Sequence, residues 1–134
     1  MSPSEREEQR YPGRMDEAAR SFFHGRPEAA KLYAHVDRLL RSIGDFECRV
    51  TKSQIAFRRR RGFAWVWTPD RWLQDDTAPL VLSVALGRRD ASQRWKEVVE
   101  PQAGRWMHHL EVRSASDLDD EVASWLREAW AQAG

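Results

Sequence analysis

The chain has 134 residues, of which 32% are charged and 41% hydrophobic, a composition typical of one compact folded domain. The formal net charge is +1, so no overall field draws the protein toward nucleic acid or anionic lipid, and any such attraction must be local. The single cysteine, Cys48, excludes an internal disulfide and multi-cysteine zinc motifs and is typical of a reducing compartment. Without a signal peptide or an apolar stretch long enough to span a membrane, the sequence predicts a cytoplasmic protein that does not bind membranes.

Two helices are expected near the amino terminus. Apolar residues recur at helical spacing through 15–24, and Gly25 follows where a helix would stop. The next helix is expected over 27–43, because its first residue is a proline and its apolar residues form one stripe. Gly44 is expected to end this helix in the left-handed conformation.

After the second helix the hydrophobic period changes to that of strands. Apolar and polar residues alternate on both sides of a two-residue turn at Lys52 and Ser53. This turn sets Cys48 opposite Phe57, so that the apolar residues of both strands share one face.

Four consecutive arginines then form a hairpin tip. Gly62 stands where a three-residue loop needs a left-handed residue, so the loop is expected to contain Arg60, Arg61 and Gly62. In this arrangement Arg58 points away from the core. Arg59 lies at the edge of the core, with the aliphatic part of its side chain along Phe63.

The same loop predicts where two tryptophans point. With three residues in the loop, Phe57 lies opposite Trp65 and Ile55 lies opposite Trp67. Both tryptophans are therefore expected in the core, where packing is favoured over a role in stacking nucleic-acid bases.

Three further segments complete the expected sheet and its covering layer. Residues 80–86 predict a strand, and the alternation through 105–113 predicts another. The segment 95–100 is ambiguous between strand and helical turn, and a short edge strand is favoured. A closing helix is expected to begin with Ser116 as its cap, followed by acidic residues in its first turn.

These elements predict an α+β fold, a two-layer sandwich with two N-terminal helices, an antiparallel sheet of four to six strands and one C-terminal helix. Residues 14–134 are expected to form one domain, preceded by a flexible arm at 1–13 that is polar and rich in turn formers. With all helices on one side, the opposite face of the sheet carries charged residues among small ones. This face has room for a ligand or a partner.

A family resemblance rests on the stretches "FFHGRPEAAKLY", "RVTKSQIAFRRRRGFAWV" and "GRWMHHLEVRSASDLDDEVASWLREAW". Over roughly 20–131 the chain resembles an uncharacterised bacterial family of small proteins, a domain of unknown function with some relatives labelled predicted transport proteins. The resemblance implies an α+β fold and supplies no catalytic or binding residues. The transport label gains no support, because the sequence contains no membrane-spanning segment.

The sequence contains none of the familiar enzyme motifs. Glycine-rich phosphate loops, dinucleotide fingerprints, "GxSxG" and "HExxH" are absent, so no cofactor is expected and a binding module is favoured over an enzyme. His108 and His109 are adjacent on a strand and project to opposite faces, so they cannot easily share one metal ion, and no metal site is expected. His108 is expected to pack in the core, whereas His109 is either a functional group or an ordinary solvated histidine on the open side.

The first functional hypothesis places a small-anion or protein-partner site on the open sheet face. Arg49, Arg58 and His109 are the candidate ligand-binding residues, because all three are expected on that face. This hypothesis describes a non-catalytic binding module.

The alternative hypothesis is nucleic-acid binding through the basic hairpin tip at 58–61. Its candidate residues are Arg58, Arg60 and Arg61, together with Lys52 in the neighbouring turn. The competing interpretation is a solubilising tip, and it is favoured because the total charge is near neutral and Glu47 is expected opposite Arg58.

Overall fold

The computed structural model describes residues 17–69 and 77–134, so the arm expected at 1–13 lies outside the described residues. The helices and strands have these bounds: α2 (Glu17–Phe22), α3 (Pro27–Ile43), β1 (Glu47–Val50), β2 (Ile55–Arg58), β3 (Gly62–Trp67), β4 (Leu80–Leu86), β5 (Glu97–Gln102), β6 (Arg105–Val112), the 3-10 turn η2 (Ala115–Asp117) and α4 (Asp120–Gln132). This order confirms the α+β class.

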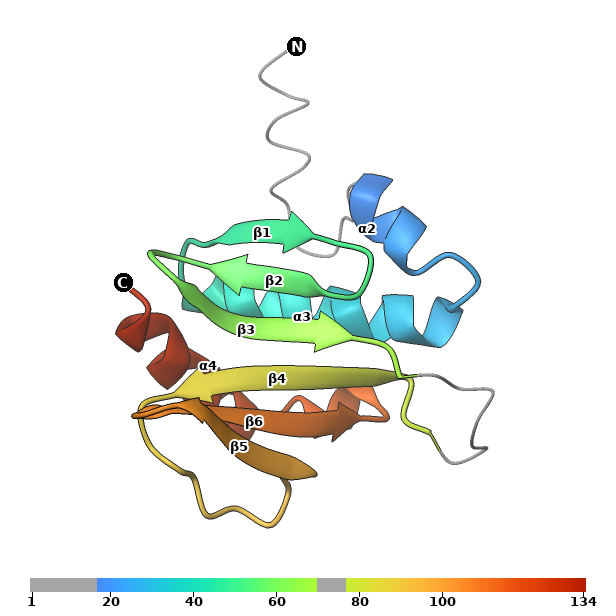
Figure 1. Cartoon of the computed structure of the whole chain (residues 1–134). Helices are drawn as coiled ribbons and strands as arrows, with labels where there is room; N and C mark the ends of the chain where they lie inside the picture. The colour runs from blue at the N-terminus through green and yellow to red at the C-terminus, as the bar shows by residue number, and fades with distance from the viewer. Residues whose placement is uncertain (1–16, 70–76) are drawn as a thin grey trace.

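The six strands form one antiparallel sheet in the order β1-β2-β3-β4-β6-β5. Figure 1 shows α3 and α4 together behind this sheet, which confirms the two-layer arrangement. We call the opposite side, which faces the viewer in Figure 1, the open face. The ambiguous segment after Trp95 is the edge strand β5, as favoured from its sequence.

The core lies between the sheet and the two long helices. Along α3, the proline at the first position has no amide hydrogen to leave unpaired, and buried residues recur every three or four positions. The buried apolar residues of the two helices are Ala29, Leu32, Tyr33, Val36 and Leu40 on α3, and Val122, Ala123, Trp125, Leu126 and Ala129 on α4. Among the described residues, no helix is both long enough and apolar enough to cross a membrane.

The hairpin β1–β2 has the predicted register. Cys48 is the partner of Phe57, and the amide of Thr51 donates to the carbonyl of Gln54 at 2.9 Å to close the two-residue turn. A turn of known length fixes the pairing of the strands on both sides, which is why this prediction is correct.

The hairpin β2–β3 differs from its predicted register by one residue. Phe57 pairs with Ala64 rather than Trp65, and Ile55 pairs with Val66, because the pairing is interrupted by a bulge between Phe57 and Arg58. The prediction that Trp65 points into the core is therefore wrong. A shift of one residue moves every side chain of a strand to the other face, so Trp65 lies on the open face, as does the second tryptophan of β3.

Two glycines differ from their predicted roles for a common reason. Gly62 lies inside β3 and is not among the positive-φ glycines of the described residues; a Cβ there would stand 2.7 Å from the ring of Trp65. Gly44 has an extended φ of 168°, not a left-handed one, and a Cβ there would stand 2.3 Å from the ring of Trp130. Both glycines therefore make room for an indole ring.

The closing helix also begins later than predicted. Ser116 lies in η2, and the N-cap of α4 is Asp119, whose carboxylate accepts a hydrogen bond from the amide of Val122 at 3.2 Å. The acidic run offers several capping residues in succession, so composition alone does not select one of them.

The shifted register predicts that two aromatic substitutions lower the free energy of unfolding by different amounts. Phe57→Ala opens a cavity at a residue that is 0% exposed and should lower the free energy of unfolding by about 3–5 kcal/mol. Trp65 is half-buried on the open face, so Trp65→Ala should lower the free energy of unfolding by less than about 2 kcal/mol. Urea unfolding of both variants measures the difference, and equal costs would contradict the register.

Candidate functional site

One row of register partners crosses the whole open face, and it consists of Arg49, Ala56, Trp65, Ser83, His109 and Glu97. Arg49 and His109 stand four strands apart in this row, so about 19 Å separates their backbones at about 4.8 Å per strand. Arg58 lies on β2, beside the strand of Arg49. The three predicted ligand-binding residues therefore do not form one compact site, and only the two arginines are neighbours.

A chain of hydrogen bonds occupies the middle of the open face. The indole nitrogen of Trp67 donates to Ser83 Oγ at 3.1 Å, and Ser83 Oγ lies 2.6 Å from His109 Nδ1. An indole can only donate, so Ser83 Oγ accepts from Trp67, and the tautomer of His109 decides whether the same oxygen donates to Nδ1 or accepts from it. Burial lowers the pKa of His109, while the nearby charge of Glu97 raises it.

This chain of bonds is structural in character. A serine beside a histidine is the minimal pair for nucleophilic catalysis, but Ser83 is only 3% exposed. Its neighbours on β4 are equally covered, although they face the open side, and they are Val81 and Ala85. The larger side chains of β3 and β6 therefore form the accessible surface, and they enclose the serine.

A second group of side chains lies at the end of the open face where β3 begins. Arg105 reaches from β6 across the end of β4, donates from Nη2 to the carbonyl of Gly62 at 2.9 Å, and holds its guanidinium 6.0 Å from the ring centre of Trp65. Arg58 is the register partner of Gly62 on the other side. Trp65 is thus flanked by two arginines, and we call Arg58, Trp65 and Arg105 the Trp65 cluster.

The Trp65 cluster has an excess of positive charge. Burial lowers the pKa of Arg105, and the charge of nearby Arg61 lowers it further. No carboxylate within 17–69 and 77–134 forms an ion pair with Arg58 or Arg105. A small hollow of about 30 Å³ opens at the same end of the sheet, and Arg61, Arg105 and Gln132 are among its lining residues.

Sequence reasoning missed this cluster for two reasons. Trp65 was assigned to the core by the wrong register, and Arg105 lies 43 residues from its partner Gly62. A signal for Arg105 was present, because it alternates in phase with the outward-facing His109 of the same strand.

Part of the arginine run is bound to the end of α4. Arg59 stacks over the ring of Trp130 at 3.6 Å and donates to the Trp130 carbonyl at 2.9 Å, rather than lying along Phe63. Arg61 donates to the carbonyl of Gln132 at 3.2 Å. These carbonyls form the negative end of the helix dipole, so both arginines stabilise the helix end. Figure 1 shows the C-terminus beside the β2–β3 turn.

The four predicted nucleic-acid residues are therefore dispersed. Arg61 is engaged with α4, whereas Arg60 has an exposed side chain and contributes its backbone amide to the carbonyl of Ala133 at 2.9 Å. Lys52 lies in the β1–β2 turn, at the opposite end of β2 in Figure 1. Binding through this tip stays a prediction, with Arg58 and Arg60 as its available arginines.

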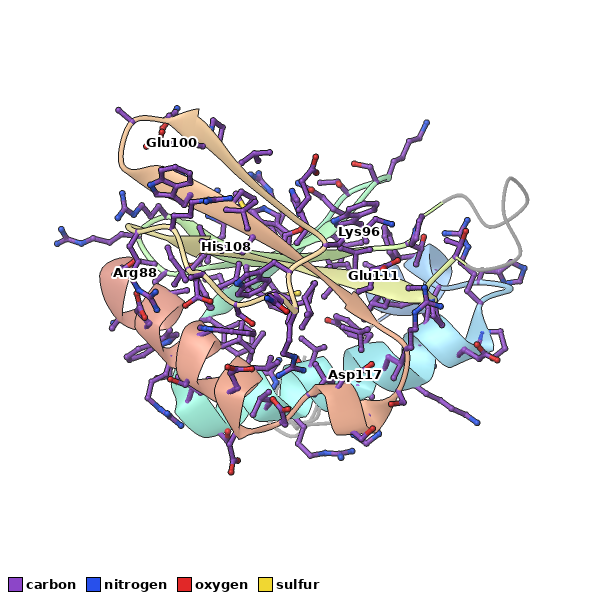
Figure 2. All side chains as sticks on the ribbon, turned by 90° about the horizontal axis from the view of Figure 1, so that it is seen from below. Arg88, Lys96, Glu100, His108, Glu111 and Asp117 are labelled. Atoms are coloured by element: carbon purple, nitrogen blue, oxygen red, sulfur yellow. The ribbon has the colours of Figure 1, made fainter. Side chains whose placement is uncertain are left out.

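The other half of the open face is balanced in charge. Glu111 lies 3.3 Å from Lys96 and 3.5 Å from Arg113, and Figure 2 shows Glu111 and Lys96 next to each other. The uncompensated positive charge on the open face is therefore on the side of β1, β2 and β3 and at the start of β6.

His108 has the packing role expected of it. It is 0% exposed, its Nε2 accepts from the amide of Asp90 at 3.0 Å, and its Nδ1 faces the carbonyls of Val84 and Trp106 at 3.3 and 3.2 Å. Burial lowers its pKa, because the charged form would lose its hydration. In the described part of the chain, no three histidine, cysteine, aspartate or glutamate residues come together as a metal site would require.

Comparison with known families finds a match over most of the chain. The family described as "Domain of unknown function (DUF5655)" matches residues 19–133. No curated protein and no solved structure matches the chain.

The stacking of Arg59 on Trp130 predicts that Arg59 contributes more to the stability of the fold than its neighbour Arg60. Arg59→Ala removes a cation–π contact and a hydrogen bond at the helix end, so it should lower the free energy of unfolding by about 1–2 kcal/mol. Arg60→Ala is the matched control, because its exposed side chain should change that free energy by less than about 0.5 kcal/mol. Urea unfolding compares them, and equal effects would mean that Arg59 does not anchor the tip.

The two strand histidines predict a stability that falls in mild acid. The folded protein lowers both pKa values below 6.5, so the unfolded chain binds more protons as pH falls through 6.5. The free energy of unfolding should therefore be larger at about pH 7.5 than at about pH 5. NMR titration checks the cause: Glu97→Gln should lower the pKa of His109 further, and a His109 pKa at or above 6.5 in the unmodified protein would contradict the account.

Proposed function

Since the chain belongs to the DUF5655 family, whose description names no activity, we propose from its geometry that it is a non-catalytic module that binds an anion on its open face. The observation that carries the proposal is the Trp65 cluster, in which Arg58 and Arg105 flank an aromatic ring without a carboxylate partner in the described residues. The proposed site retains Arg58 and its neighbour Arg49 from the sequence hypothesis and adds Arg105.

Electrostatics support an anion as the ligand. Arg105 is close enough to Arg61 for the two like charges to disfavour each other, and a bound anion would offset that repulsion. The planar guanidinium group donates two parallel hydrogen bonds to phosphate or carboxylate oxygens, which is the reason arginine is common in such sites. Phosphate and carboxylate groups are therefore the expected ligand classes.

The arrangement of Ser83 and His109 supports binding over catalysis. The serine oxygen is covered, and it is already engaged by the indole of Trp67 and by His109 Nδ1. His109 Nδ1 is engaged with Ser83, so Nε2 is the ring nitrogen that could form a hydrogen bond with a ligand at the far end of the face. A location in the bacterial cytoplasm completes the proposal, supported by the single cysteine and by the resemblance to a bacterial family.

Thermal shift with pyrophosphate, citrate and ATP tests the proposed anion site. At least one of these anions should raise the melting temperature of the unmodified protein, because a ligand that binds only the folded state stabilises it. The shift should be lost in the double variant Arg58→Gln and Arg105→Gln, each protein being compared with its own ligand-free melting temperature.

The matched control is Arg127→Ala, which removes an exposed arginine of α4 and should retain the full shift. The proposal fails if none of the three anions raises the melting temperature, or if the shift persists in the double variant.

A further inference from the structure

We infer that the open face binds single-stranded nucleic acid, with bases stacked on Trp65 and Trp67 and phosphates held by the arginines around them. The inference rests on the proposed anion site and names its ligand. It also moves nucleic-acid binding away from the hairpin tip, where Arg59 and Arg61 are bound to α4.

The spacing of the two tryptophans suits successive bases. Trp65 and Trp67 are two residues apart on β3 and share the open face, so their backbones are about 7 Å apart. This is about twice the 3.4 Å that separates neighbouring nucleotides of one strand in a duplex. Each indole can therefore take one base of an extended, unstacked strand.

Both rings are held in place before any ligand arrives. Trp67 is fixed by its hydrogen bond to Ser83 and by the edge of His109, whose ring centre is 6.3 Å away at 84°. Trp65 lies against Gly62, where no side chain intervenes. A surface ordered in advance loses little conformational entropy on binding, which favours affinity.

The register partners of the two tryptophans have smaller side chains than an indole. Trp65 stands between Ala56 on one side and Ser83 on the other, and Trp67 is paired with Val81. All three are nearly fully covered, so the indoles and the other large side chains form the accessible surface of the open face.

Charge complementarity selects a path for the phosphates. Arg49 and Arg58 lie on one side of Trp65 and Arg105 on the other, while exposed Arg60 extends the same end of the sheet. The nearest acidic side chain in the register is Glu47, which forms no ion pair with Arg58 among the described residues. A nucleic-acid strand that runs along β3 over the two rings therefore has cations on both of its flanks at Trp65.

Single strands are favoured over duplex by this geometry. In a duplex the base faces are covered by their neighbours, and tryptophans on a sheet cannot reach them. Duplex would contact the arginines alone.

Fluorescence anisotropy with labelled strands of about twelve nucleotides tests the inference. Oligothymidylate, oligouridylate and a mixed-sequence duplex are titrated at two salt concentrations, and both single strands should bind more tightly than the duplex. The double variant Trp65→Ala and Trp67→Ala should weaken single-strand binding roughly 10-fold or more. Arg58→Gln with Arg105→Gln should weaken single-strand binding and make the slope of log affinity against log salt concentration shallower by about 1.4.

Three further variants control for folding and for tryptophan content. Trp65→Phe and Trp67→Phe keep an aromatic face and should retain most of the affinity, and Trp106→Phe, on the opposite face of β6, should bind like the unmodified protein. Circular dichroism and the melting temperature establish that each variant folds.

The inference is overturned if neither single strand binds at low salt, if duplex binds as tightly, or if the folded tryptophan double variant binds like the unmodified protein. These failures are distinct from failure of the proposed function. If pyrophosphate, citrate or ATP still stabilises the protein through Arg58 and Arg105, the anion site stands and its ligand is a different anion.

Discussion

The bulge between Phe57 and Arg58 is the constraint on which the rest of the open face depends. At this bulge Phe63 is the extra residue of β3, between the pairs Arg58–Gly62 and Phe57–Ala64, and beyond it the side chains of β3 exchange faces. Phe57 keeps its place in the core, while Trp65 moves to the side of the sheet opposite α3 and α4. The same strand would otherwise present small aliphatic residues outward.

Indole packing and the end of α4 secure this arrangement. Gly62 admits the ring of Trp65 and Gly44 admits the ring of Trp130, while Arg59 closes over Trp130 and binds its carbonyl. The arginine run therefore has a double role. Arg59 and Arg61 fasten the hairpin to a helix end, and this leaves Arg58 on the open face beside Trp65.

The sequence predicted the features that depend on local rules. The α3 helix follows from an opening proline and a 3.6-residue stripe, and the β1–β2 register follows from a two-residue turn. The β2–β3 register did not follow, because a run of four arginines and a glycine allows more than one loop length. Contacts between residues distant in sequence could not be predicted either. Arg59 contacts Trp130, which is 71 residues away in the sequence, and Arg105 contacts Gly62, which is 43 residues away.

One NMR measurement tests the central claim most directly, namely the pairing of β2 with β3. In an antiparallel sheet the α-protons of opposed residues at non-hydrogen-bonded positions are close enough for a strong nuclear Overhauser effect. The account predicts this effect between Ala56 and Trp65. An effect between Ala56 and Val66 instead would return both tryptophans of β3 to the core and contradict the proposed binding face.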